Sequence, residues 1–234
     1  IKRSMGMLLH LDIEPEPDGL LETGAEFIDW FENDLVPMAR QVLVQNLQMT
    51  AEQAESSVKE HVCLCYDVCH FAIGYEPHSA IIEELSRKGI LIGKIQISAA
   101  LKASIPDDLH AKARITEAFS KFNEPTYLHQ VVMRQRDGRL LRYRDLPDAI
   151  AAGENPLVNE WRAHFHVPVF NEDLGLLQST QSDIITVLNV QKATPFTNHM
   201  EVETYTWEVL PDILKAPLNL SIIRELNWVK NTLS

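Results

Sequence analysis

The chain has 234 residues, of which 45% are hydrophobic and 23% are charged, as in ordinary folded globular proteins. Its formal net charge of −12 argues against a nucleic-acid partner, because binding to phosphates requires clustered Lys and Arg. The longest strongly apolar run, residues 90–101, is too short to cross a bilayer and contains Lys94, so we expect no membrane span. The first residues lack the apolar core of a secretion signal, which favours a cytoplasmic protein.

Apolar runs alternate with amphipathic segments through the first hundred residues, an alternation typical of βα units on a parallel sheet. The predicted strands cover residues 6–14, 62–67 and 90–98. The predicted helices between them cover residues 20–45, 50–61 and 78–88. Thr50 and Gln53 form a capping-box pattern at the start of the second helix, and Gly89 follows the third.

Three cysteines fall close together in the second predicted strand and just after it, as Cys63, Cys65 and Cys69. A thiolate metal site is one interpretation, but the sequence has no second Cys pair to complete a tetrahedral shell. We therefore expect buried, reduced cysteines.

The order of elements changes after residue 104. A predicted helix over residues 107–121 leads into a predicted β-hairpin over residues 127–143, with Asp137-Gly138 at its turn. Then come a strand over 162–170, a helix over 178–190, a strand over 199–207 and a helix over 219–232. We predict a single domain over residues 1–234, with an insertion at about 104–160.

Each predicted strand has one apolar face and one ionisable face, because side chains two residues apart share a face. In the first strand, for example, Leu11 and Ile13 lie opposite Asp12 and Glu14. A barrel of parallel strands explains this pattern, since its outer face packs against helices and its inner face lines a site at the carboxyl ends of the strands. The predicted fold class is therefore α/β, of the (β/α)8 TIM-barrel type.

Carboxylates, imidazoles and one amide stand at these strand ends: Glu14, Asp67, His70, Gln96, His164, His166 and Glu203. Such groups bind Mn²⁺, Fe²⁺ or Zn²⁺. Carboxylates that converge on one mouth repel one another unless they are protonated or joined by a cation, so we predict a divalent metal cofactor. Taken singly, each residue has a structural alternative: Glu14 as a solvated loop carboxylate, Asp67 as the cap of a turn, and His164 and His166 on an exposed edge strand.

The run Asp67-Val-Cys-His70 resembles the Asp-x-x-His at a strand end in xylose isomerase-like barrels, which include sugar isomerases, epimerases and metal-dependent apurinic endonucleases. Glu14 and Glu203 resemble the metal-binding Glu residues of an earlier strand and of the last strand, and Gln96 takes the place of a metal-binding His. Within that superfamily the chain is similar to the EboE branch of bacterial metabolite-traffic clusters, through the segments LDIEPEPDGLLET, YLHQVVMRQRDG, HFHVPVF and EVETYTWEVLP.

The resemblance implies a role for each candidate residue. Glu14 and Glu203 would be the catalytic pair that exchanges a proton with the substrate. The metal ligands would be Glu14, Asp67, His166 and Glu203, with the histidine, or its neighbour His164, making up for Gln96. The substrate would contact His70, Gln96, His164, Tyr205 and Trp207.

The leading hypothesis is a metal-dependent isomerase or epimerase acting on a small sugar-like or polyol metabolite. The alternative is a non-catalytic metabolite-binding or trafficking protein of the EboE type, which Gln96 favours. A third, phosphodiester cleavage on DNA, conflicts with the acidic charge.

A full barrel of this superfamily has four strands before its first metal-binding Glu, so a Glu at position 14 implies the C-terminal half to two-thirds of a barrel. Open strand edges would favour a homo-oligomer or association with the missing N-terminal segment.

Overall fold

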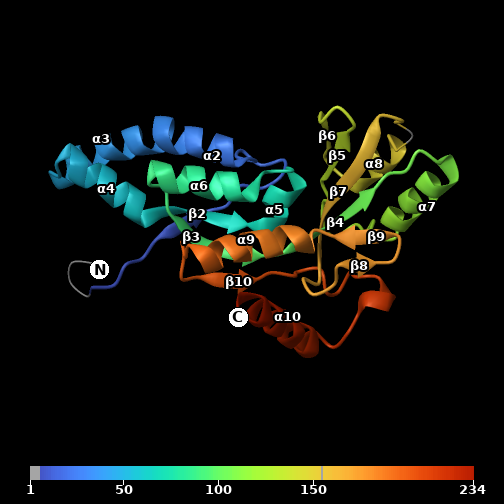
Figure 1. Cartoon of the computed structure of the whole chain (residues 1–234). Helices are drawn as coiled ribbons and strands as arrows, with labels where there is room; N and C mark the ends of the chain where they lie inside the picture. Colours follow the sequence, from blue (N-terminus) through green and yellow to red (C-terminus); the bar gives the residue numbers. More distant parts are fainter. Residues whose placement is uncertain (1–5, 154) are drawn as a thin grey trace.

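Four parallel strands form the first of two sheets in the computed structural model, which describes residues 6–153 and 155–234 (Figure 1). The strand order is β1-β2-β3-β10. These strands are β1 (Leu11–Ile13), β2 (Val62–Asp67), β3 (Ile92–Ile97) and β10 (Met200–Val202). The expected parallel sheet of an α/β protein is confirmed, and each strand runs parallel to its neighbours.

Helices connect and cover the parallel strands (Figure 1). They are α2 (Gly24–Trp30), α3 (Val36–Leu47), α4 (Ala51–His61), α6 (His78–Lys88), α9 (Gln181–Ala193) and α10 (Leu218–Leu233). A π-helical turn at Phe31–Leu35 joins α2 to α3, so the helix predicted over residues 20–45 is observed from Gly24 to Leu47, with this change of hydrogen bonding inside it. The predicted capping box is confirmed, since Thr50 accepts from the backbone of Gln53 and its own backbone donates to the Gln53 side chain. Gly89 closes α6 with a φ of +68°, as expected of a left-handed cap.

The second sheet is antiparallel and has six strands in the order β6-β5-β7-β4-β9-β8. They are β4 (Ala99–Ser104), β5 (Val131–Gln135), β6 (Leu140–Tyr143), β7 (Val158–Val167), β8 (Asp173–Leu174) and β9 (Leu177–Ser179). The helices α7 (Leu109–Ser120) and α8 (Leu146–Ala151) lie beside this sheet. The predicted hairpin is confirmed as β5 and β6, with Gly138 at a φ of +87° in the turn, although its first strand begins at Val131.

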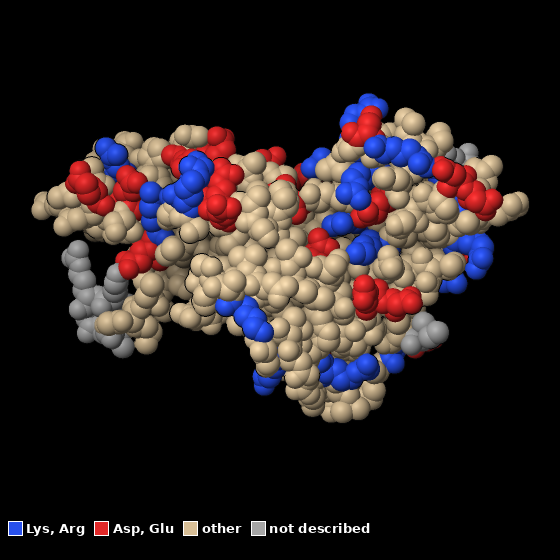
Figure 2. Space-filling view, viewed as in Figure 1, with Lys and Arg blue, Asp and Glu red and all other residues tan. Residues whose placement is uncertain are grey.

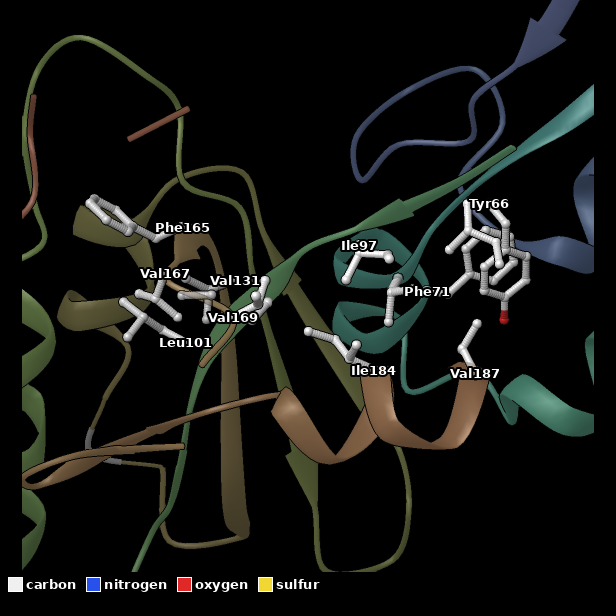
Figure 3. Packing of buried hydrophobic residues seen from close by; sticks show 14 of the residues in the cluster. Tyr66, Phe71, Ile97, Leu101, Val131, Phe165, Val167, Val169, Ile184 and Val187 are labelled. Atoms are coloured by element: carbon white, nitrogen blue, oxygen red, sulfur yellow. The ribbon is translucent and has the colours of Figure 1, made fainter. Parts of the chain in front are cut away.

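One run of chain passes through both sheets, because only Ser98 separates β3 from β4. Figure 3 shows Ile97 on this run near Phe71 and near Ile184 of α9, and Leu101 further along beside Val167. All of these side chains belong to one buried apolar cluster. The two sheets therefore share a core, and the end of the parallel sheet faces the start of the antiparallel one.

The prediction that residues 162–170 form a barrel strand is wrong. Residues 162–167 belong to β7, which is antiparallel to both β4 and β5, with Leu101 opposite Ala163. The alternation of side chains has the same period in parallel and antiparallel strands, so the pattern could not identify the sheet. The residues that the structure describes form no closed barrel, since the parallel sheet ends at β1 and β10.

The first and last predicted strands are longer than the observed ones. The first, residues 6–14, has strand geometry only at Leu11–Ile13, and Leu9 and Leu11 are exposed rather than covered by helices. The last, residues 199–207, ends at Val202, and Tyr205 and Trp207 lie in the turns that follow.

Acidic and basic side chains are interspersed on the molecular face seen in Figure 2. Within the described ranges, none of the helices has the length and apolar character that crossing a bilayer requires. Cys63, Cys65 and Cys69 are buried, as expected, and the structure has no disulfide between them.

Glu225 of α10 links this last helix to the segments that follow β7 and β10, beside the site described below. Its Oε1 accepts hydrogen bonds from the backbone N–H of Val169, 3.1 Å away, and from the hydroxyl of Thr204, 2.6 Å away. The residue is only 1% exposed, and burial raises the pKa of its carboxyl.

Stability should therefore depend on pH through Glu225. With its pKa raised in the folded chain, its contribution to the free energy of unfolding is complete at acid pH and is lost as the pH rises through the folded pKa. Glu225→Gln keeps the acceptor oxygen without the charge, so its melting temperature should match the parent protein near about pH 4 and exceed it near about pH 8. Glu117→Gln, at an exposed helical glutamate, is the control. If the melting temperature of the parent protein rose relative to that of Glu225→Gln as the pH rises, the prediction would be wrong.

Candidate metal centre

Three carboxylates converge at the carboxyl ends of the parallel strands. Glu14 follows β1, Asp67 ends β2, and Glu203 follows β10. One carboxylate oxygen of each lies within 4.8 Å of the others. The parallel sheet explains the convergence, because it brings the carboxyl ends of all its strands to one edge. These three are the carboxylates that the sequence singled out.

Gln96, near the end of β3, stands among these carboxylates and is 4% exposed. Its amide nitrogen Nε2 lies 2.9 Å from Glu14 Oε1, 3.0 Å from Asp67 Oδ2 and 2.5 Å from Glu203 Oε2. An amide nitrogen carries two protons and cannot donate fully to three acceptors. One carboxyl must keep its own proton, or a cation must bind among the three.

The carboxyl groups respond differently to this crowding. Burial, the charge of Asp67 and a hydrogen bond with Asp67 raise the pKa of Glu203 to about 8. Burial and the charge of Asp67 also raise the pKa of Glu14. Burial opposes ionisation of Asp67 as well, but His70, His166 and donated hydrogen bonds outweigh it, and its pKa is lowered. In the metal-free protein, Asp67 thus holds the negative charge and Glu203 the proton at neutral pH.

The two carboxylate oxygens of Asp67 have different hydrogen-bond partners. Oδ1 caps the short helix α5 (Val68–Ile73) by accepting from the backbone N–H of His70 at 3.0 Å, and also accepts from the Ser98 hydroxyl at 2.8 Å. Oδ2 faces Gln96. The capping role that the sequence allowed for Asp67 is therefore present, and it aims the second oxygen at the other carboxylates.

His166 reaches the same region from β7 and is 1% exposed. Its Nδ1 donates to the backbone carbonyl of Glu203 at 3.1 Å, which leaves Nε2 of the neutral ring as a bare lone pair. This Nε2 is buried without a hydrogen-bond partner. Burial lowers the pKa of His166 to about 4, so the lone pair is free at neutral pH. One ligand atom each of His166, Asp67 and His70 lie within 4.8 Å of one another.

His70 and His164 adjoin this group, and the Nε2 atoms of their rings are 3.2 Å apart. His70 also approaches the carboxylates, with Nδ1 3.4 Å from Glu14 Oε1. The two histidines, like Gln96, had been predicted to contact a substrate. The structure places all three beside the carboxylate cluster.

Aromatic rings form one wall of the site. The ring of Tyr205 lies 4.5 Å from that of His166 and 4.9 Å from that of Tyr127, measured between centroids. Trp207, also predicted to line the site, packs instead against the hydrophobic core, because the chain leaves strand geometry after Val202 and its alternation no longer holds.

Sequence reasoning missed several residues of the site. The thiol of Cys65 donates a hydrogen bond to Oε1 of Gln96 at 2.9 Å. The hydroxyl of Ser98 donates one to Oδ1 of Asp67 at 2.8 Å. Cys65 and Ser98 each share a strand face with a predicted site residue, so the alternation of side chains could have identified them. Tyr127 and Gln130 lie in the segment just before β5, and no local pattern marks them.

Comparison with protein-family models, with curated proteins and with solved structures finds no match to this chain. Function must therefore be argued from the geometry of the site. The residues fit a divalent transition metal, because they offer three carboxylates and a buried imidazole nitrogen without a partner.

Gln96→Leu tests whether the amide substitutes for a cation. Without the amide the carboxylates lose their shared donor, so the metal-free variant should be less stable by about 1–3 kcal/mol. Added Mn²⁺ should recover more stability in the variant than in the parent protein, as thermal melts would show. Gln178→Leu, at an exposed glutamine of β9, is the control. An undiminished melting temperature for metal-free Gln96→Leu would show that the carboxylates do not depend on the amide.

Proposed function

We propose that this chain is a metal-dependent isomerase or epimerase that acts on a small sugar-like or polyol metabolite. One observation carries the proposal: Glu14, Asp67 and Glu203 converge, from three parallel strands, on the single amide nitrogen of Gln96. We propose that these carboxylates and His166 hold the divalent ion, whether Mn, Zn or Fe.

The residues support proton transfer at carbon. The bound ion would polarise adjacent oxygens of the substrate. Glu203, whose pKa of about 8 lies near neutrality, suits a group that takes up and returns a proton, and Glu14 would be its partner. Tyr205 covers His166 and helps to exclude water from that side.

The arrangement of strands supports a relationship to xylose isomerase-like barrels. Four parallel strands with connecting helices, and ionisable residues at their carboxyl ends, correspond to part of such a (β/α)8 barrel. The insertion predicted at about 104–160 would then comprise α7, the hairpin β5–β6 and α8. The buried reduced cysteines support a cytoplasmic location.

Gln96 favours a second candidate, a metabolite-binding or trafficking protein of the EboE type. Its amide occupies the space among the carboxylates where a catalytic ion would bind, and Cys65 holds it there. Such a protein would bind its metabolite without exchanging a proton at carbon.

The metal content of the purified protein tests the site. After reconstitution with Mn²⁺, Fe²⁺ or Zn²⁺, elemental analysis should find at least about one equivalent of metal, and Glu203→Gln should lower that content while changing the melting temperature of the metal-free protein little. Glu201→Gln, at an exposed residue of the same strand that pairs with Lys94, is the control and should keep the full content. Less than about a tenth of an equivalent in the reconstituted parent protein would refute the assignment.

Deuterium exchange separates the two candidate functions without a known substrate. Incubation of the metal-loaded protein in D₂O with a panel of ketoses, aldoses and cyclic polyols should label one carbon of a substrate, as mass spectrometry would detect, because the proton that Glu203 returns has exchanged with solvent. Glu14→Gln and Glu203→Gln should each lower the rate of labelling by at least about 100-fold. A panel member that binds and gains no deuterium would support the trafficking candidate instead.

A further inference from the structure

A separate group of metal-ligating side chains lies at the amino ends of the parallel strands, whereas the carboxylate cluster lies at their carboxyl ends. His10 immediately precedes β1, Asp12 is the middle residue of β1, and Cys63 is the second residue of β2. The parallel register places Asp12 directly opposite Cys63. One ligand atom of each of the three lies within 4.8 Å of the others. An imidazole, a carboxylate and a thiol therefore meet at a place that the proposed function does not use.

The backbone of β3 makes room for the carboxylate of Asp12. The register of β2 against β3 skips Gly93, so β3 has one extra residue at this point. Such a bulge is uncommon in a parallel sheet, and bulges re-aim side chains at functional sites. A Cβ on Gly93 would collide with Oδ1 of Asp12, so the carboxylate rests against backbone that has no side chain. The irregular register and the glycine together hold Asp12 beside Cys63.

His10 is held against the same carboxylate. Its Nδ1 lies 2.6 Å from Oδ1 of Asp12, and the two side chains are 20% and 14% exposed. Cys63 is buried, so the group is open to solvent on the side of His10 and Asp12. A hydrogen bond between ring and carboxylate explains that one contact. A shared ion explains in addition the thiol beside both groups and the room made at Gly93.

A groove of about 620 Å³ opens over this group, and His10, Asp12, Lys94, His199 and Glu201 are among the residues that line it. Nζ of Lys94 pairs with Oε2 of Glu201 at 2.7 Å, so a carboxylate balances the nearby positive charge and a cation is not repelled. The exposed ring of His199, just before β10, has its centroid 5.6 Å from that of His10. Two imidazoles on one tetrahedral ion have centroids about 5 Å apart, so His199 is within reach of a fourth position.

We propose that His10, Asp12 and Cys63 bind a structural zinc ion, with His199 as the fourth ligand. Imidazole, carboxylate and thiolate are the ligands of Zn²⁺, and a thiolate selects zinc over Mg²⁺ or Mn²⁺. On binding, the thiol of Cys63 would release its proton to solvent, and the sulfur would bond to the metal. Because β1 has only three residues and lies at the edge of its sheet, the ion would fasten it to β2. The proposal goes beyond the proposed function and does not require it.

Cobalt substitution tests the site through its sulfur ligand. Co²⁺ occupies zinc sites, and a thiolate ligand gives bound Co²⁺ an intense charge-transfer band in the near ultraviolet. Titration of Co²⁺ into the metal-stripped full chain, under reducing conditions, should produce this band. Cys63→Ser should abolish the band, and Cys65→Ser, at the next cysteine of β2, should keep it. A band that persists in Cys63→Ser, or the absence of a band in the parent protein, would overturn the proposal.

Zinc stoichiometry separates this site from the carboxylate cluster. Elemental analysis of the Zn²⁺-loaded full chain should find one equivalent fewer in His10→Gln than in the parent protein, and Glu203→Gln should keep that equivalent. His110→Gln, at an exposed histidine, is the control and should bind as the parent protein does. Circular dichroism of each metal-free variant confirms that it is folded. Full parental stoichiometry in His10→Gln would overturn this proposal, whereas full stoichiometry in Glu203→Gln would count only against the carboxylate site.

Thermal melts test the structural role of the ion. An ion that binds the folded chain alone raises its melting temperature, so Zn²⁺ should stabilise Glu203→Gln, in which only the site at His10 is intact. Zn²⁺ should leave the melting temperature of the double variant Glu203→Gln, Cys63→Ser unchanged. Equal stabilisation of both proteins by Zn²⁺ would overturn the proposal.

Discussion

The site depends on one electrostatic constraint, the placing of three carboxylates around one amide nitrogen. Gln96 has two protons to donate, and Glu14, Asp67 and Glu203 compete for them. The metal-free chain meets the constraint by keeping Glu203 protonated, as its pKa of about 8 indicates. A cation would meet it more completely, because it would satisfy all three carboxylates at once. The same crowding thus explains why the pKa of Glu203 is raised.

Because β3 continues almost directly into β4, the histidines of the antiparallel sheet lie beside the carboxylates. Since only Ser98 separates the two strands, the antiparallel sheet begins where the parallel strands end. Its strand β7 pairs with β4 and so delivers His164 and His166 to the carboxyl ends of the parallel strands. In a closed barrel, further parallel strands would supply such side chains. Here a sheet of different topology supplies them.

Local sequence patterns predict some residues of this site and not others. Alternation along β2 and β3 identified Asp67 and Gln96, because each strand is buried on one face and its polar residues share the other. Alternation also identified His164 as inward-facing, but it could not show that β7 is antiparallel, since both kinds of strand repeat every two residues. Gln130 was not predicted, because its contact with His164 arises from pairing between distant strands, which leaves no local trace.

The turn that begins at Asp67 links two groups of polar side chains. Asp67 faces Gln96, whereas His70, three residues later, faces His164, and the first turn of α5 fixes their separation. The two groups differ in chemistry, because one consists of carboxylates around an amide and the other of two imidazoles. Asp67 itself caps the helix that carries His70, so a change in its charge would alter the geometry of both groups together.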